Sequence, residues 1–241
     1  MLELQNISYT VNDDGNDKEI IRDVSLQLSD DRFYVITGPN GGGKSTLAKI
    51  ISGIYRPDSG RILFDGKDIT DMSITDRARL GISFAFQQPV KFKGITVKDL
   101  ITLAAGDMST ADACTYLSEV GLCARDYINR EVNSSLSGGE LKRIEIAVTL
   151  ARSSKMTVFD EPEAGIDLWS FNNLIKVFDR LHSRIHGTIV IISHQERIIN
   201  IADELILIAG GKITKTGSKE EVLPLIMSEN WAVDSCDKLG A

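Results

Sequence analysis

Residues 38–45 read Gly38-Pro39-Asn40-Gly41-Gly42-Gly43-Lys44-Ser45, and this stretch decides the fold. It matches the pattern Gly-x-x-x-x-Gly-Lys-Ser/Thr, follows a β-rich run at Phe33–Thr37 and opens a helical pattern at Thr46–Ser52. A glycine-rich loop in this setting turns backbone N–H groups toward phosphate oxygens, and the helix N-terminus adds partial positive charge. We expect Lys44 to reach the β- and γ-phosphates of a nucleotide and Ser45 to ligate Mg²⁺, with Thr46 and the rest of the loop completing the site.

A second group of polar residues follows another apolar run. Met156–Glu161 reads as a buried strand that ends in two carboxylates, Asp160 and Glu161. Asp160 suits the coordination shell of Mg²⁺, and Glu161 suits the role of general base or water-orienting group. The pair is a weak signal by itself, and its position after a phosphate-binding loop strengthens it.

A third string, Leu136-Ser137-Gly138-Gly139-Glu140, precedes a helical pattern that runs from Leu141 to Arg152. A Ser-Gly-Gly sequence at the start of a helix exposes backbone donors and a hydroxyl, which makes an anion site. A simple capping turn would use the same residues, so the string alone leaves both interpretations open.

The rest of the chain predicts an α/β fold. Leu2–Val11 and Ile20–Leu28 alternate like strands on either side of a polar turn cluster, which is typical of an antiparallel hairpin. Residues 96–152 are mostly helical in pattern. Two buried strand runs, Met156–Phe159 and Thr188–Ser193, enclose an amphipathic helix, and this alternation indicates a largely parallel sheet. The apolar stripe of that helix, which we expect to pack in the core, consists of Leu168, Phe171, Leu174, Ile175, Phe178 and Leu181.

Composition argues against several classes of protein. The chain has 241 residues and is 42% hydrophobic, which fits one compact α/β domain or a domain with a modest inserted subdomain. Its formal net charge of −7 argues against a nucleic-acid partner. No signal peptide is visible, and the most apolar runs are too short to cross a bilayer, so we expect no direct membrane insertion. Three cysteines, Cys114, Cys123 and Cys236, form no Cys-x-x-Cys pair and indicate free thiols in a reducing cytoplasm.

The order of these strings resembles the ATP-binding cassette (ABC) ATPases. The phosphate loop, the Leu-Ser-Gly-Gly-Glu string, the Asp-Glu strand end and Ser193-His194 follow one another, and the resemblance covers nearly the whole chain. It implies a single domain over residues 1–241 with a phosphate-loop parallel-sheet core and an antiparallel β subdomain. It also implies a helical subdomain inserted at about 90–152.

The same resemblance implies a nucleotide-dependent homodimer with two composite sites. In each site, Ser137 and Gly139 of one subunit would contact the γ-phosphate held by Lys44 of the other. Gln87 would be the family's glutamine loop, which touches Mg²⁺ and the attacking water. His194 would be the switch histidine on the γ-phosphate.

Two further positions follow from the family pattern. Asp167 matches the D-loop, which links the two sites across the dimer. The family often stacks adenine on an aromatic residue in the first hairpin, and here Val11 occupies that position, with Tyr9 two residues earlier. This departure puts adenine stacking in doubt and predicts loose discrimination among bases.

A longer string is more specific within the family. Residues 76–90 read Asp-Arg-Ala-Arg-Leu-Gly-Ile-Ser-Phe-Ala-Phe-Gln-Gln-Pro-Val, and with Gly94 they resemble SufC, the ATPase family of the SUF iron–sulfur cluster assembly machinery. Segments 129–133, 163–167 and 193–198 also resemble that family. The likeness implies a SufB/SufD-like scaffold protein as partner, whose cluster site is reshaped when ATP closes two copies of the chain. The cluster ligands would lie on the scaffold, because the chain has no cysteine cluster.

Other functions fit parts of the pattern. A nucleotide-binding subunit of a membrane transporter would carry the same ATPase motifs, and this is the main alternative. A DNA-linked ABC ATPase would need a long coiled-coil insertion, and the segment from Gln87 to Leu136 is too short and shows no sustained heptads. That segment is also shorter than in the bacterial SufC pattern, which indicates a compact form. A non-catalytic subunit would be expected to have lost Lys44 or Glu161, and both are present.

Overall fold

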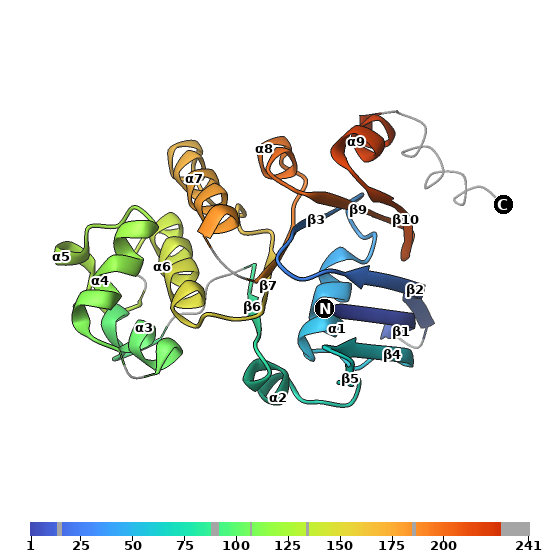
Figure 1. Ribbon diagram of the computed structural model, residues 1–241, viewed down its shortest axis with the longest axis horizontal. Helices are drawn as coiled ribbons and strands as arrows, with labels where there is room; N and C mark the ends of the chain where they lie inside the picture. The colour runs from blue at the N-terminus through green and yellow to red at the C-terminus, as the bar shows by residue number, and fades with distance from the viewer. Residues whose placement is uncertain (14–15, 88–91, 107, 134, 185–186, 228–241) are drawn as a thin grey trace. The chain divides into compact units, whose positions relative to one another are not determined.

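The computed structural model describes residues 1–13, 16–87, 92–106, 108–133, 135–184 and 187–227 (Figure 1). The chain forms two compact units, one made of Met1–Arg77 and the chain from Ile192 onward, the other of Ala78–Ile191. Two features of the sequence, Gln88–Val90 and Cys236, lie outside the described residues.

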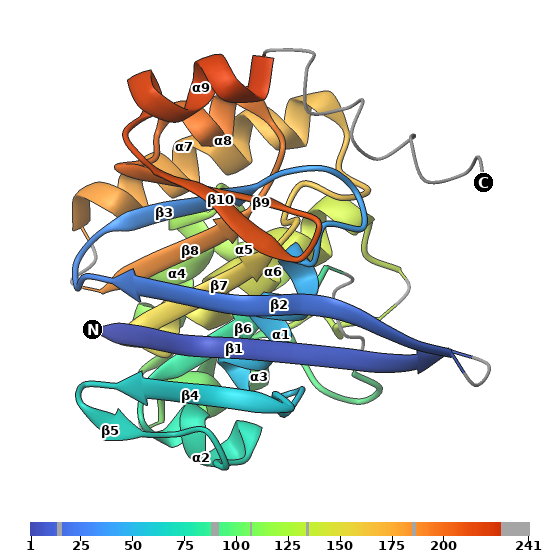
Figure 2. The ribbon, with the colours of Figure 1, turned by 90° about the vertical axis from the view of Figure 1, so that its right-hand side faces the viewer.

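The first unit contains an antiparallel sheet of four strands in the order β2-β1-β4-β5 (Figure 2). β1 (Leu2–Asp13) and β2 (Asn16–Leu28) form the hairpin that the alternation of the sequence predicts. β4 (Ser59–Phe64) pairs with β1, and β5 (Lys67–Asp68) pairs with β4. Near its start β1 buries alternate residues from Leu2, which is the period of a strand with one covered face.

A second set of strands in this unit leads into the phosphate loop. β3 (Phe33–Thr37) is buried along its whole length and pairs in parallel with β9 (Glu204–Ala209). β9 in turn forms an antiparallel hairpin with β10 (Lys212–Gly217). A continuous apolar strand such as β3 is typical of a parallel sheet covered on both faces. The helices that begin in this unit are α1 (Lys44–Ser52), α2 (Ile74–Arg79), α8 (Glu196–Asn200) and α9 (Lys219–Met227).

The end of α1 is held by an arginine. Gly53 takes a left-handed conformation with φ of 80°, which ends the helix. Arg77 of α2 is 1% exposed and donates to the carbonyls of Ile50 and Ile51 at 2.7 and 2.8 Å. A cation at a helix C-terminus is favoured by the helix dipole, and it satisfies carbonyls that have no partner within the helix. Burial lowers the pKa of Arg77 to about 10, so it stays charged at neutral pH.

The second unit has a small parallel sheet. β6 (Ile82–Ala85) pairs in parallel with β7 (Met156–Asp160), and β8 (Thr188–Ile192) lies on the other side of β7. The two strands predicted in this part of the sequence, β7 and β8, are confirmed to within one residue.

The predicted amphipathic helix is α7 (Leu168–Arg184). Leu174 and Phe178 of its apolar stripe are buried, and Phe171 and Ile175 are half-buried. Phe178 packs edge-on against Phe159 of β7 with ring centroids 5.1 Å apart, which confirms the stripe as core for these residues. The side chains of Leu168 and Leu181 lie outside the described ones.

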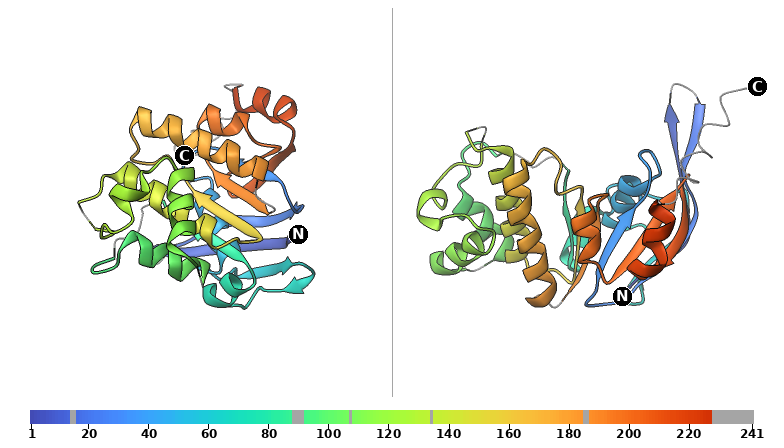
Figure 3. Two further views of the ribbon diagram at one scale, coloured as in Figure 1. Left: turned by 60° about the vertical axis from the view of Figure 1, so that its left-hand side comes forward. Right: turned by 90° about the horizontal axis from the view of Figure 1, so that it is seen from above.

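The remaining helices of the second unit are α3 (Val97–Ala105), α4 (Thr110–Glu119), α5 (Ala124–Tyr127) and α6 (Gly138–Ala151). α3, α4 and α5 gather beside α6, green next to yellow-green in Figure 3. Three of these helices start with a capping box, which pairs Thr96 with Asp99, Ser109 with Asp112 and Ser137 with Glu140. The helical character predicted for 96–152 is confirmed, and the insertion of a subdomain into one domain over 1–241 stays a prediction.

Candidate functional site

The phosphate loop connects β3 to α1 and is shaped by its glycines. Gly38, Gly41 and Gly43 have φ angles of 140°, 75° and 101°, which residues with a side chain rarely adopt. A Cβ on Gly38 would lie 1.9 Å from the carbonyl oxygen of Ile208 in β9, so the loop passes against that strand with no room for a side chain. The close approach explains why this position requires glycine.

Lys44 places its charge inside the loop. The side chain is 6% exposed, and Nζ donates to the carbonyls of Gly38 and Pro39, each at 2.9 Å. The first turn of α1 contains no acidic residue, so the positive end of the helix is not neutralised there. Ser45 and Thr46 follow in the same turn and are half-buried. An enclosed ammonium at an uncapped helix N-terminus fits the phosphates of a nucleotide, and the Ser45 hydroxyl is an oxygen ligand of the kind that Mg²⁺ takes.

His194 lies in the same unit, directly after β8. Ser193 is completely buried, and its backbone N–H donates to the Ile36 carbonyl of β3 at 3.1 Å. The Ser193 hydroxyl accepts the Gln195 N–H at 3.0 Å, which makes a tight turn around His194. The histidine is exposed, although it follows a fully buried strand. An exposed imidazole on a fixed turn is suited to contact with a ligand.

The second unit brings Gln87 and Glu161 together. Asp160 ends β7 and is 3% exposed. Glu161 comes next with φ of 44°, a left-handed conformation that is uncommon for glutamate and costs on the order of 1 kcal/mol. Its carboxylate accepts a hydrogen bond of 2.6 Å from Nε2 of Gln87. The structure therefore joins two of the predicted catalytic residues directly.

Two residues of α6, which the sequence analysis missed, hold the start of the Gln87 loop. Lys142 is 1% exposed and donates to the carbonyl of Phe86, and its Nζ lies 2.8 Å from Oε2 of Glu145. Oε1 of Glu145 accepts the Phe86 N–H at 3.1 Å. Burial raises the pKa of Glu145, although Lys142 opposes the shift. The i, i+3 spacing of opposite charges was the signal that could have indicated this pair.

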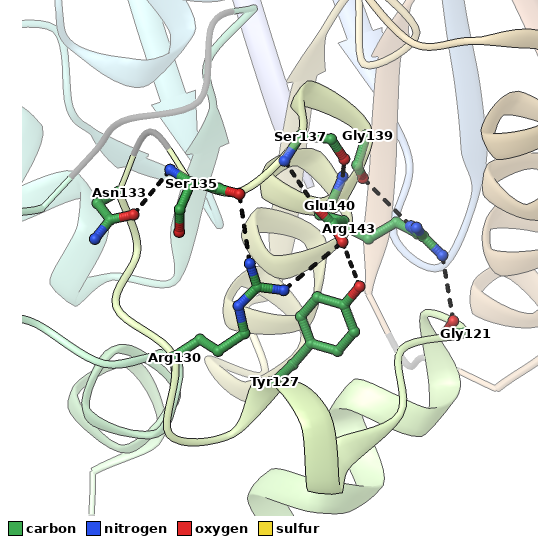
Figure 4. A network of polar contacts seen from close by, with 9 residues as sticks. All are labelled: Gly121, Tyr127, Arg130, Asn133, Ser135, Ser137, Gly139, Glu140 and Arg143. Atoms are coloured by element: carbon green, nitrogen blue, oxygen red, sulfur yellow. Dashed lines mark hydrogen bonds and ion pairs between the residues drawn. The ribbon is translucent and has the colours of Figure 1, made fainter.

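Glu140, the last residue of the Leu-Ser-Gly-Gly-Glu string, lies at the centre of a polar network (Figure 4). Ser137 caps α6: its hydroxyl accepts the Glu140 N–H at 3.3 Å, and its own N–H donates to Oε2 of Glu140 at 2.6 Å. Tyr127 donates its hydroxyl to Oε1 of Glu140, and Nη1 of Arg130 lies 3.9 Å from the same oxygen. The string thus forms a capping turn in this structure. A capping turn is compatible with both interpretations of the string, the anion site and the simple cap.

The network sets the charge of Glu140. Partial burial alone would raise its pKa, but the hydrogen bonds from Tyr127 and Ser137 outweigh burial and hold the pKa below the ordinary value. The same bond, together with burial, raises the pKa of Tyr127. At neutral pH Glu140 is therefore a carboxylate and Tyr127 a neutral donor. Arg143 adds a further contact, because Nε donates to the Gly139 carbonyl at 3.3 Å.

Asp167 precedes α7 and is exposed. Its carbonyl accepts the Phe171 N–H at 2.9 Å, which forms the first turn of that helix. Asp167 and the Leu-Ser-Gly-Gly-Glu string lie in the second unit, as do Gln87, Asp160 and Glu161. The phosphate loop and His194 lie in the first.

The hairpin offers no free aromatic at the position predicted for adenine. Val11 is 38% exposed. Tyr9 already stacks on Tyr55, with ring centroids 5.3 Å apart and planes 7° from parallel. One face of Tyr9 is therefore occupied within the chain.

Comparison with known proteins shows where this chain belongs. A model of the family described as ABC transporter matches residues 21–164. An uncharacterized ABC transporter ATP-binding protein of Methanocaldococcus jannaschii is 40% identical over 217 residues, which is 86% of this chain and 86% of the relative. The probable ATP-dependent transporter ycf16 of Pyropia yezoensis is 32% identical over 235 residues, 90% of this chain and 91% of the relative. A solved dimeric ATP-binding cassette in a post-hydrolysis state with ADP and Pi matches with a TM-score of 0.80 at 25% identity, over 90% of this chain and 98% of its own.

These likenesses confirm the expected α/β cassette fold and the expected ATPase activity. Among the helices that the structure describes, none combines the length and the apolar character needed to span a membrane. The chain belongs to the ATP-binding cassette family, as an ATPase that binds ATP together with Mg²⁺.

Proposed function

We propose that the chain is the nucleotide-binding subunit of an ABC transporter, in which ATP hydrolysis moves a membrane-embedded partner. The names of its relatives carry this proposal, because both the protein of Methanocaldococcus jannaschii and ycf16 are named for transport. In such a complex this chain supplies the ATPase, and a separate chain supplies the path through the membrane.

In the proposed site, the loop from Gly38 to Thr46 binds the nucleotide phosphates. The buried ammonium of Lys44 supports this role, since it already faces two carbonyls of the loop. Mg²⁺, when bound, neutralises phosphate charge, and Ser45, Gln87 and Asp160 are the residues that would hold it.

Glu161 is the proposed general base, which takes a proton from the attacking water. The Gln87 amide supports this assignment because it has two ends with different chemistry. Nε2 donates to Glu161, which orients the carboxylate, while Oε1 is an acceptor suited to a metal ion. His194, exposed on its fixed turn, would contact the γ-phosphate.

The proposal includes a dimer that ATP holds together. Ser137 and Gly139 of one copy would contact the γ-phosphate bound by the other, and Asp167 would link the two sites. The Glu140 carboxylate follows Gly139 directly in the chain and would repel that γ-phosphate. The bonds of Glu140 to Tyr127 and Ser137, with Arg130 nearby, compensate part of this negative charge within the chain.

A hollow of about 190 Å³ in the second unit suits the docking of the membrane partner. Its lining is mostly apolar and includes Phe84, Phe92, Leu100 and Val148, with Glu145 among them. Phe86 and Phe92 are 39% and 37% exposed, which is high for aromatic side chains. Glu145 lines the hollow and accepts the Phe86 N–H, so an apolar segment of the partner seated there would act on the start of the Gln87 loop.

Replacement of Glu161 tests the catalytic part of the proposal. Glu161→Gln should lower ATP hydrolysis at least about 100-fold and let ATP-bound dimers accumulate, because the amide cannot act as a base. Phosphate release and size-exclusion chromatography with ATP and Mg²⁺ measure the two effects. Asp126→Asn, an exposed acid on α5, is the matched control and should hydrolyse ATP normally. Hydrolysis by Glu161→Gln at the rate of the control would overturn the assignment.

A second candidate partner is a SUF-type scaffold for iron–sulfur cluster assembly. Residues 76–90 favour it, because they resemble SufC more specifically than the shared ATPase motifs do. Purification from the chain's own cells separates the candidates. A multi-span membrane protein that co-purifies only in detergent supports the transporter, whereas a partner that co-purifies without detergent and carries iron and acid-labile sulfide supports the scaffold.

A further inference from the structure

The turn of the β9–β10 hairpin contacts the phosphate loop. Its two turn residues, Gly210 and Gly211, have φ angles of 56° and 79°, the signs that a two-residue hairpin turn of type I′ requires. The backbone N–H of Gly211 donates to the carbonyl of Gly42 at 3.1 Å. The carbonyl of Gly211 accepts the Arg22 N–H of β2 at 2.8 Å. One residue thus bonds the phosphate loop on one side and the first hairpin on the other.

The contact leaves no room for a side chain. A Cβ on Gly211 would lie 2.5 Å from the carbonyl oxygen of Ile20, a backbone atom that cannot rotate away. A Cβ on Gly43 would lie 2.7 Å from Cδ1 of Ile21 and 3.0 Å from the same Ile20 oxygen. Gly210, by contrast, has nothing within 4 Å of its position for a Cβ. Of the two turn glycines, only Gly211 is packed.

The bond to Gly42 fixes the direction of the next amide. The described chain has no cis peptide bonds, so the carbonyl of Gly42 and the N–H of Gly43 point in opposite directions across one plane. Holding that carbonyl toward Gly211 turns the Gly43 N–H away from the hairpin. The N–H of Gly42 is already bonded to the Pro39 carbonyl at 3.1 Å. Gly43 is the N-cap of α1, where amides face a bound anion.

We infer that Gly211 is a positioning residue of the nucleotide site, which orients the Gly42–Gly43 peptide so that its N–H binds a nucleotide phosphate. The inference rests on the proposed phosphate-binding role of the loop and adds a contribution from the far end of the chain. A side chain at Gly211 would push the hairpin off the loop and let this peptide rotate. The loss would be felt in nucleotide affinity, since the hydrolytic groups of the second unit are unchanged.

The test compares Gly211→Ala with Gly210→Ala. Both variants place alanine at a positive φ in the same turn, so both carry the same type of backbone strain. Fluorescent mant-ADP titrations should show about tenfold weaker binding for Gly211→Ala, the size of one lost charge-assisted hydrogen bond, and less than about twofold for Gly210→Ala. The KM for ATP should rise with the dissociation constant while kcat stays within about twofold. Equal affinities for the two variants would overturn the inference.

A second substitution removes only the donor. Replacing Gly211 by glycolic acid changes its amide to an ester, which deletes the N–H and adds no atoms that clash. This ester variant should also bind mant-ADP several-fold more weakly, and unchanged binding would overturn the inference. Lys44→Ala in the same titration keeps the proposed function separate. Normal mant-ADP binding by Lys44→Ala would refute the phosphate-binding role of the loop itself. Weak binding by Lys44→Ala together with normal binding by the ester variant would refute only the role of Gly211.

Discussion

Replacing Glu145 with alanine should detach the Gln87 loop from α6. Glu145 accepts the Phe86 N–H at 3.1 Å and pairs with the Lys142 ammonium at 2.8 Å, so the variant removes one partner from each. Lys142 is 1% exposed, and breaking a buried ion pair by removing one partner costs roughly 3–5 kcal/mol. Because Lys142 keeps its bond to the Phe86 carbonyl, we expect the lower end, about 3 kcal/mol. That loss lowers the folding equilibrium constant roughly 150-fold.

Urea unfolding followed by circular dichroism measures this loss, and ATP hydrolysis measures its consequence for Gln87. We expect kcat to fall about tenfold with little change in KM, since the proposed phosphate-binding loop belongs to the other unit. Thr149→Ala is the control on the same helix. It removes a hydroxyl that donates to the Glu145 carbonyl at 2.8 Å and should cost less than about 1 kcal/mol. Glu145→Gln keeps an acceptor for the Phe86 N–H and should restore most of kcat. The reasoning fails if Glu145→Ala is as stable as Thr149→Ala, or if its kcat matches that control.

Three more predictions follow from single contacts. Tyr127→Phe removes the hydroxyl that bonds Glu140 and should lower hydrolysis by the dimer about threefold, while mant-ADP affinity of the monomer, measured by titration, stays unchanged. Arg77→Leu removes the guanidinium that donates to the Ile51 carbonyl and leaves the Ile50 carbonyl with only the Gly53 N–H, and it should cost about 3 kcal/mol in urea unfolding, with less than 1 kcal/mol contradicting the capping role. Burial holds the folded pKa of Glu145 above its ordinary value of 4.5, so its contribution to stability is present below that pH and is lost as pH rises through the folded pKa. The free energy of unfolding of the native chain minus that of Glu145→Gln should therefore fall as pH rises above 4.5, and a difference independent of pH would contradict this.

The sequence predicts best where neighbours in the chain make the structure. Strand β3, the loop and α1 are contiguous, so the pattern around Lys44 predicts their order and the fold. The capping box of Ser137 and Glu140 depends on residues three apart, within one turn of helix. These features depend on residues close together in the chain, so the spacing of residue types is enough to predict them.

Contacts between segments that are distant in the chain could not be predicted from local spacing. Gly211 reads as an ordinary hairpin glycine, and only the folded chain places its N–H against the Gly42 carbonyl. Lys142 and Glu145 read as a surface pair on a helix, because nothing in their spacing shows that the backbone of Phe86 covers them. The left-handed backbone of Glu161 is uncommon for glutamate, so no propensity could predict it.

Helix α6 connects the Leu-Ser-Gly-Gly-Glu string to the proposed hydrolytic residues through adjacent turns. Ser137 caps its first turn, and in the following turns Lys142 and Glu145 hold both the carbonyl and the N–H of Phe86. A shift of α6 cannot leave the start of the Gln87 loop behind without breaking a buried, charged contact. In the proposed dimer, a γ-phosphate that draws Ser137 toward it would also move Gln87 and, through the 2.6 Å bond, the Glu161 carboxylate. In the proposed dimer, binding of ATP across the interface and alignment of the base would then be one event.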